Sequence, residues 1–337
     1  MLNFDPARFL SIQTGTVSIA RDLGTLVGRL VAEGADSLFF MGSGGAGILM
    51  QPATDLMRRA SNLPCHNVLC AEIVLTGHVA LGPKSVVIMP SLSGTTKESI
   101  AAMDYVKARG ATVISITGHA DTPLAKGADH SFVNFAEDDT SCEMFYVTSL
   151  VAALAAMQAR GERSDYDRII AELAGLPQQL LAVKQAFEPR ADVLAQAIAG
   201  DGWHILTGSG AAWPEAYYYG MCILEEMQWI RTRPVHASDF FHGTLELVEK
   251  GVSVVVFAGE DETRPLTDRL IAFAKGYTDK LTVLDTRDLA TTGLSSDLRA
   301  MLAPALLATV LERLSAHLEV MRNHPLVTRR YYKRVAY

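Results

Sequence analysis

The chain has 337 residues, of which 49% are hydrophobic and 20% are charged, and its formal net charge is −7. This composition provides ample material for a packed core, and the length allows one large domain or two of ordinary size. The negative balance argues against a uniformly basic surface, so we expect no nucleic-acid partner, although a local basic patch stays open.

The start of the chain and its cysteines indicate where the protein works. The first twenty residues lack the continuous apolar run of a secretory signal. No uninterrupted apolar run reaches the roughly 18 residues that span a membrane, so no membrane partner is expected. The four cysteines show no CxxC spacing, and they are Cys65, Cys70, Cys142 and Cys222. We predict reduced thiols in a cytoplasmic protein, with no disulfide and no metal site.

Short apolar runs alternate with longer helical patterns along the first half of the chain. Residues 37–47 predict a strand that leads into a glycine turn, and residues 48–60 predict a helix. Residues 84–91 predict a buried strand, residues 97–110 a helix that ends at a glycine, and residues 111–118 another strand. Continuous apolar strands between helices predict an α/β fold with a mainly parallel sheet flanked by helices.

The pattern recurs in the second half of the chain. HILTGSGAAW at 204–213 resembles LFFMGSGGAG at 38–47. SVVVFAG, which begins at 253, and LTVLDT, which begins at 281, resemble the runs that begin at 85 and 111. The three offsets are 166, 168 and 170 residues, and ordered matches at nearly one offset predict two tandem domains of similar topology.

We therefore expect five parts in the chain. They are an N-terminal helical segment (1–34), a first, phosphate-binding domain (35–165), a helical connector (166–200), a second, catalytic domain (201–320) and a C-terminal tail (321–337). Within the connector, Leu176-Pro177 predicts a local break, because the residue before a proline disfavours the helical conformation.

Gly42, Gly44 and Gly47 form a G-x-G-x-x-G pattern after the first predicted strand. The dinucleotide fingerprint also needs an acidic residue about 20 positions on, at the end of the second strand. No acid stands at 67–69, and Glu72 comes late. We therefore expect no redox cofactor, and the ordinary alternative is that these glycines let a helix pack close to a strand.

The loop SLSGTT, residues 91–96, predicts a site for a phosphate monoester. Ser91, Ser93, Thr95 and Thr96 offer hydroxyls, Gly94 frees the backbone, and the following helix presents unpaired N–H groups. The ordinary alternative is helix capping, for which one hydroxyl suffices. The matching loop of the second half reads GEDETR, and its carboxylates would repel a phosphate.

The second half contains EEMQWIRTRPVHASDFFHG, residues 225–243. Glu225 and Glu226 lie about 100° apart on a helix, so they face different ways. A carboxylate in apolar surroundings suits a general base, but the periodicity alone favours a solvated pair that flanks a buried stripe. His242 follows two phenylalanines, as a core histidine often does, and Asp239 is close enough in sequence to orient it.

These motifs resemble the double sugar-isomerase (SIS) domain family. The likeness spans nearly the whole chain, through GSGG, SLSGTT, the EMQWI…HASDFFHG block and the tail HPLVTRRYYKRVAY. The block and the tail most resemble deglycases of fructose-amino acid 6-phosphates, of the fructose-asparagine and fructoselysine type. The isomerase domain of glucosamine-6-phosphate synthase is a more distant member of the same family.

The resemblance implies an enzyme that cleaves a ketose-amine 6-phosphate to glucose 6-phosphate and a free amine, without cofactor or metal. It assigns proton transfer to Glu226 and ring opening to His242, which a neighbouring subunit donates in a homodimer. The substrate phosphate is expected on the hydroxyls and glycines of two loops, Ser43, Gly44, Ser91, Ser93, Gly94 and Thr96. Arg330 and Lys333 of the basic tail are candidate contacts for the rest of the substrate.

Three departures and two alternatives accompany this resemblance. Relatives often carry a hydroxyl residue where this chain has Gly44. Glucosamine-6-phosphate synthase has a lysine where this chain has Ile223, and its glutaminase domain has no counterpart in this sequence. One alternative is an aldose–ketose or amino-sugar phosphate isomerase or deaminase, which needs the same groups. The other is a non-catalytic sugar-phosphate sensor, although about 35 residues before the first strand are too few for a helix-turn-helix domain.

Overall fold

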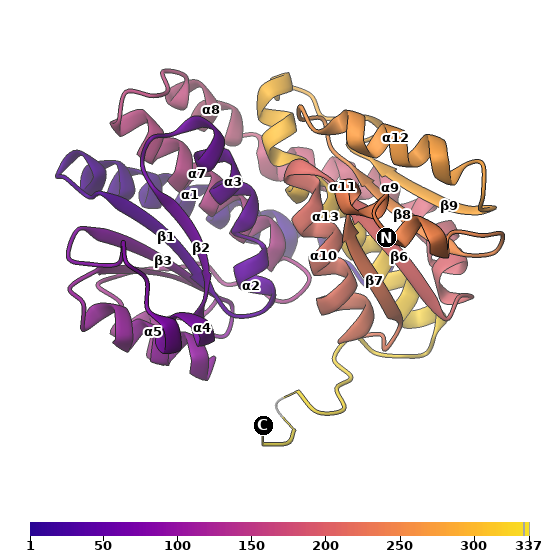
Figure 1. Cartoon of the computed structure of the whole chain (residues 1–337), viewed down its shortest axis with the longest axis horizontal. Coiled ribbons are helices and arrows are strands. Elements are labelled where there is room, and N and C mark those ends of the chain that lie inside the picture. Colours follow the sequence, from indigo (N-terminus) through magenta and orange to yellow (C-terminus); the bar gives the residue numbers. More distant parts are fainter. Residues whose placement is uncertain (333, 337) are drawn as a thin grey trace. The chain divides into compact units, whose positions relative to one another are not determined.

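The computed structural model describes residues 1–332 and 334–336 and divides into two compact units (Figure 1). The N-terminal unit comprises residues 6–179 and 293–298. The C-terminal unit comprises residues 1–5, 180–292 and the described residues from 299 onward. The predicted connector 166–200 is thus shared between the units, and the first five residues belong to the C-terminal one. A helix ends at Leu173 and the next begins at Leu176, where the sequence predicts a break.

The N-terminal unit is built on a five-stranded parallel sheet with the order β2-β1-β3-β4-β5. Its strands are β1 (Ser37–Gly42), β2 (Cys65–Leu69), β3 (Ser85–Ser91), β4 (Thr112–Thr117) and β5 (His130–Val133). Its helices are α1 (Pro6–Ala32), α2 (Gly45–Ile48), α3 (Gln51–Ala60), α4 (Cys70–Thr76), α5 (Lys97–Lys107), α6 (Pro123–Gly127), α7 (Ser141–Ala159) and α8 (Tyr166–Leu173).

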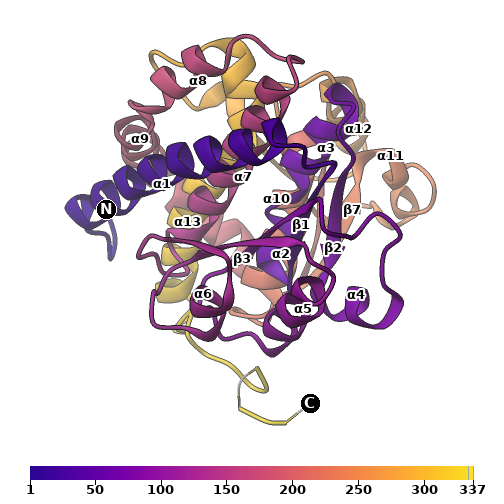
Figure 2. The ribbon, with the colours of Figure 1, turned by 90° about the vertical axis from the view of Figure 1, so that its left-hand side faces the viewer.

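Both faces of this sheet are covered, which explains why its central strands read as continuous apolar runs. Phe39 and Met41 of β1 pack in one core cluster with residues of α4, α5 and α6. Leu38 and Phe40, which point to the opposite face, are equally buried. Figure 2 shows α1 and α7 on that side, with α4, α5 and α6 on the other.

The C-terminal unit contains a four-stranded parallel sheet with the order β7-β6-β8-β9. Its strands are β6 (Trp203–Gly208), β7 (Arg231–His236), β8 (Ser253–Ala258) and β9 (Lys280–Asp285). The α-helices are α9 (Leu176–Ala199), α10 (Trp213–Tyr218), α11 (Ala237–Phe240), α12 (Arg264–Ala274) and α13 (Ser296–Met321), of which α9 and α13 begin in the N-terminal unit. The shorter elements are η1 (Gly210–Ala212), the π-helix η2 (Tyr219–Glu225), η3 (Thr244–Leu247) and η4 (Thr286–Asp288).

The two sheets confirm the repeat that the sequence predicts. The three matched runs form β1 and β6, β3 and β8, and β4 and β9. These strands occupy equivalent places, because β2-β1-β3-β4 and β7-β6-β8-β9 follow one order and every pairing is parallel. The extra strand β5 extends only the first sheet.

Two long helices qualify the expectation about membranes. By length and composition α7 and α13 pass as membrane-spanning helices, although polar residues interrupt their apolar runs. In the most apolar 18-residue stretch of each helix, 89% of α7 and 83% of α13 is buried inside the protein, as is usual for core helices. The four cysteines are buried and free, as the sequence predicts.

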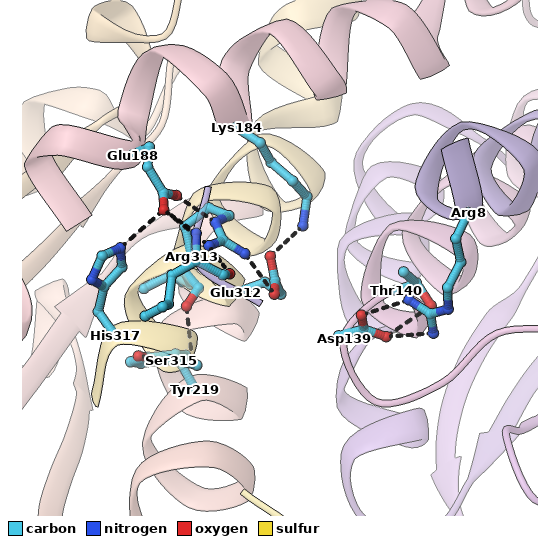
Figure 3. Close-up of polar contacts among 12 residues, drawn as sticks. Arg8, Asp139, Thr140, Lys184, Glu188, Tyr219, Glu312, Arg313, Ser315 and His317 are labelled. Carbon is cyan, nitrogen blue, oxygen red and sulfur yellow. Dashed lines mark hydrogen bonds and ion pairs between the residues drawn. The ribbon is translucent and has the colours of Figure 1, made fainter. Parts of the chain in front are cut away.

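A buried ionic network joins α9, α13 and the first residues of the chain within the C-terminal unit (Figure 3). The fully buried Arg313 donates to Glu188 from Nε (2.6 Å) and to the carbonyl of Leu2 from Nη2 (2.5 Å). The N–H of Leu2 in turn donates to Glu188 (2.7 Å). Lys184, also fully buried, donates to Glu312 (2.7 Å). Both buried cations are therefore paired.

Candidate active site

Loops after two neighbouring strands meet at one edge of the N-terminal sheet. From β1 the chain goes to β2 on one side and later to β3 on the other, so the sheet order reverses between β1 and β3. In open parallel sheets, ligands bind outside the carboxyl ends of the strands at such a reversal. The turn at Ser43 and Gly44 and the loop 91–96 both begin at this place.

Loop 91–96 is held in shape from within. Ser91 ends β3, and its Oγ accepts a hydrogen bond from the N–H of Gly94 (3.2 Å). Ser93 Oγ accepts from the hydroxyl of Thr95 (3.1 Å). Gly94 has a φ of 61°, and a Cβ there would lie 2.2 Å from Thr122 Oγ1. This position therefore requires glycine for both its backbone conformation and its close approach to Thr122.

The loop hydroxyls do not serve as an ordinary helix cap. Thr96 is the N-cap residue of α5, yet its side chain makes no capping hydrogen bond. The N–H groups in the first turn of α5 are thus left for another acceptor, and a helix N-terminus favours an anion. Ser43 Oγ lies 3.1 Å from Ser99 Oγ in this first turn. The structure therefore brings Ser43 together with the start of α5.

Two glycines near the first turn, Gly42 and Gly47, allow close backbone packing. A Cβ on Gly42 would lie 2.5 Å from the backbone nitrogen of Gly47, so these two glycines let α2 pack against β1. Gly44, in contrast, is exposed and has a φ of 56°. In the middle of β2, the Asn67 amide donates to the carbonyl of Gly47 (3.0 Å), and residues 67–69 include no carboxylate for a ribose. The dinucleotide interpretation thus gains no support.

The equivalent place in the C-terminal unit is filled by the protein's own carboxylate. Gly210 after β6 has a φ of 54°, close to the value at Gly44. Asp261, from the loop after β8, accepts from the N–H of Ala211 (2.8 Å) and from the N–H of Thr263 (2.9 Å). Asp261 thus occupies the anion position that the first unit leaves to its two loops, whereas the sequence suggested only repulsion.

Glu226 follows a segment of irregular helix. Residues 219–225 form a π-helix, and the N–H of Glu226 donates to the carbonyl of Met221, five residues back (3.1 Å). Trp229 has a φ of 55°, which is rare for an aromatic residue. Such strained segments persist only where surrounding contacts hold them, and they cluster at functional sites. No sequence pattern signalled either irregularity.

The two neighbouring glutamates have different surroundings. Glu225 is exposed, and its Oε1 accepts from the hydroxyl (2.5 Å) and the N–H (3.2 Å) of Thr232 in β7. Glu226 is partly buried, and its Oε1 forms an ion pair with Nε of Arg329 at 2.9 Å. The sequence predicts that the two carboxylates face different ways, and Glu226 is the one that meets the C-terminal tail.

One tail residue of the candidate site, Arg330, contacts the segment that follows Glu226. The guanidinium of Arg330 lies 3.8 Å from the ring centroid of Trp229. Lys333 falls outside the described residues. The sequence pointed to this tail through its clustered cations, but nothing in the pattern indicated that Arg329 would pair with Glu226.

His242 is exposed on the C-terminal unit and is not the core histidine that its phenylalanine neighbours suggested. Phe240 is fully buried, and the guanidinium of Arg269 stacks on the ring of Phe241, 4.0 Å from its centroid. The two phenylalanines thus hold the turn in place, while the side chain of His242 is exposed to solvent. Asp239 contributes its backbone carbonyl, which accepts from the N–H of His242 (2.9 Å). The loops at Ser43 and 91–96 belong to the N-terminal unit, and the Glu226 segment belongs to the C-terminal unit.

Comparison with known proteins places these features in context. Residues 33–160 match the SIS domain family. The chain is 31% identical over 327 residues to a fructosamine deglycase of Bacillus subtilis, covering 96% of this chain and 99% of the relative. It is 28% identical over 308 residues to a fructoselysine 6-phosphate deglycase of Escherichia coli O157:H7, with coverages of 91% and 88%. A crystal structure of a phosphosugar isomerase candidate from Bacillus subtilis superposes with a TM-score of 0.89 at 30% identity, covering 96% of this chain and 99% of that one.

Proposed function

Since the chain belongs to the sugar-isomerase (SIS) domain family, we propose that this enzyme is a deglycase that cleaves a ketose-amine 6-phosphate to glucose 6-phosphate and a free amine. The coarser conclusion, a phosphosugar deglycase or isomerase, rests on the likeness to relatives of both kinds. The observation that carries the finer proposal is the match over 96% of the chain to a protein named as a fructosamine deglycase.

In the proposed reaction the substrate phosphate binds to the loops at Ser43 and 91–96. His242 moves a proton from the anomeric hydroxyl to the ring oxygen, which opens the ring and leaves a ketone at C2. Glu226 then takes a proton from C1, the electron pair of the broken C–H bond forms the C1=C2 double bond, and the electron pair of the C2 carbonyl moves to its oxygen, which takes a proton from water to give an enolamine. The same carboxyl returns its proton to C2 while the nitrogen lone pair forms the C1=N bond of a protonated imine. Water hydrolyses this protonated imine to the aldehyde and the amine, with release of one proton.

One feature of each unit supports this scheme. The uncapped start of α5 and the hydroxyls of loop 91–96 suit a phosphate dianion. Glu226 lies at the end of a strained π-helix, where a general base would be positioned precisely enough to serve two adjacent carbons. Asp261 closes the equivalent place of the C-terminal unit, so we assign one phosphate to each chain.

We further propose that His242 acts in the site of a second copy of the chain, in a cytoplasmic homodimer. Its exposure supports this role, because a histidine that serves a neighbouring subunit must stand on the surface of its own. The short helix α11 and the anchored Phe241 would fix its position in the partner's site.

The test is a panel of ketose-amine 6-phosphates, each assayed for release of glucose 6-phosphate, beside fructose 6-phosphate as the substrate of an isomerase. We expect Glu226→Gln to reduce turnover by about 10³-fold or more while phosphate binding persists. Glu225→Gln is the matched control, since it changes the neighbouring carboxylate that binds Thr232. Conversion of fructose 6-phosphate alone would favour the isomerase, and a fully active Glu226→Gln variant would contradict the scheme.

A further inference from the structure

We propose that Arg329 is a positioning residue for Glu226, so that the C-terminal tail acts on the proton-transferring carboxylate and not on the substrate. This inference deepens the proposed function and rests on it. The sequence assigned Arg330 and Lys333 of the basic tail to substrate contacts, and the ion pair of 2.9 Å points to a different role for Arg329.

The guanidinium of Arg329 is fixed on two sides. Nη1 donates to the carbonyls of Leu326 (2.6 Å) and Thr328 (3.0 Å) within the same turn of the tail. Nε faces the other way and contacts Oε1 of Glu226. Only 13% of the Arg329 side chain and 33% of the Glu226 side chain are exposed. A planar guanidinium that is held by its own backbone turn offers a carboxylate one defined direction.

Further contacts attach the tail to the segment that follows Glu226. The amide of Gln228 donates to the carbonyl of His324 (2.7 Å), and Arg322 donates to the carbonyl of Gln228 (3.1 Å). The ring of His324 meets Trp229 edge-on, with centroids 4.5 Å apart. Arg330 covers the same Trp229 ring. These contacts supply the support that a positive φ at Trp229 needs.

The proposed proton transfer makes two demands on Glu226 that an ion pair with Arg329 would meet. The base must begin as a carboxylate, and a neighbouring cation favours the ionised form. It must also reach C1 and then C2 without turning away, and a misplacement of about 1 Å can cost roughly 10²-fold in rate. A fixed guanidinium that holds one oxygen of Glu226 meets both needs.

The competing role is distinguishable by kinetics. An arginine that binds the phosphate or the amino-acid carboxylate of the substrate would act mainly on KM. An arginine that positions the base acts on kcat and leaves the binding of inorganic phosphate unchanged. If Arg329 acts only through Glu226, replacing Arg329 lowers the rate of the wild-type enzyme but not that of a variant that already lacks Glu226. The rate losses of the two replacements are then not additive.

The experiment compares Arg329→Met, Arg329→Lys, Glu226→Gln and the double variant Arg329→Met/Glu226→Gln, with Arg29→Met as control. Arg29, in the last turn of α1, pairs with the exposed Glu33 just after the helix, so we expect its replacement to leave activity unchanged. Circular dichroism verifies folding, and calorimetry with inorganic phosphate measures anion binding.

We expect Arg329→Met to lower kcat by about 100-fold with less than about a threefold change in KM. Added guanidinium should restore part of the rate, and lysine should restore less because it lacks the planar fork. The double variant should be no slower than Glu226→Gln. An increased KM with unchanged kcat, an unchanged enzyme, or additive losses in the double variant would overturn the inference. Full activity of Glu226→Gln would instead overturn the proposed function.

Discussion

Replacing Glu188 with glutamine should destabilise the C-terminal unit by about 3 kcal/mol at neutral pH. Burial alone would raise the pKa of this carboxyl. The hydrogen bonds from Arg313, from the Leu2 N–H and from His317, with the charge of Arg313, outweigh burial and lower the pKa from 4.5 to about 2. Each tenfold change in proton affinity is about 1.4 kcal/mol, so this difference corresponds to about 3 kcal/mol. The side chain is only 18% exposed, so solvent screening removes little of this value.

The sign of the pH dependence follows from the lowered pKa. The unfolded carboxyl binds protons below about pH 4.5, whereas the folded one binds them only near pH 2. The stabilisation by Glu188 is therefore complete above the upper value and is lost as the pH falls through the lower one. The difference between wild type and Glu188→Gln should accordingly shrink between these two pH values. At neutral pH the variant also removes the nearer carboxylate of the buried Arg313, which keeps the longer contact of Nη1 with Glu312 at 3.4 Å.

Tryptophan fluorescence during urea unfolding is the suitable assay. The three tryptophans, Trp203, Trp213 and Trp229, all lie in the C-terminal unit, so their signal reports on the unit that contains Glu188. Asp288→Asn is the control, because its pair with Arg190 is exposed and should contribute less than about 1 kcal/mol. The reasoning fails if Glu188→Gln unfolds at the wild-type urea concentration, or if its deficit persists undiminished near pH 2.

The remaining predictions concern the proposed site. In Gly94→Ala, the alanine would have to adopt a φ of 61° with its Cβ 2.2 Å from Thr122 Oγ1. Because this strain distorts the proposed phosphate loop, KM for the sugar phosphate should rise by about tenfold. A KM equal to that of the wild type would contradict this role of the loop. Asp261→Ala frees the anion position of the C-terminal unit, and calorimetry should then find a second inorganic phosphate per chain, whereas an unchanged stoichiometry would refute the assignment. Co-expressed Glu226→Gln and His242→Ala chains should regain about a quarter of wild-type activity if dimers share their sites, and mixed chains without activity would exclude sharing.

Much of the fold could be predicted from local patterns. Parallel strands that are buried on both faces carry continuous apolar runs, and β1, β3, β6 and β8 all show them. The repeat offset then fixed which strands are equivalent. Loop 91–96 was visible because an excess of hydroxyls stands at the junction of a strand and a helix, and the side chain of Thr96 makes no capping hydrogen bond.

The rest depends on contacts between distant residues or on backbone strain. Arg329 meets Glu226 only after the chain has completed α12, β9 and α13, so no spacing rule could connect them. The positive φ of Trp229 is imposed by its neighbours and is not a property of tryptophan. The sequence around His242 misled because Phe240 is buried as expected, while the chain turns outward directly after Phe241.

The π-helix determines which of two neighbouring glutamates faces Arg329. Glu225 and Glu226 differ in position by one residue, and one residue turns the direction of a helical side chain by about 100°. The N–H of Glu226 bonds to Met221, one residue further back than an α-helix would use. A one-residue change of this backbone register would offer Glu225 to Arg329 instead. The identity of the proposed base would thus depend on hydrogen bonds of the main chain, and mutations within 219–224 that favour a regular α-helix should affect the choice of carboxylate without replacing either glutamate.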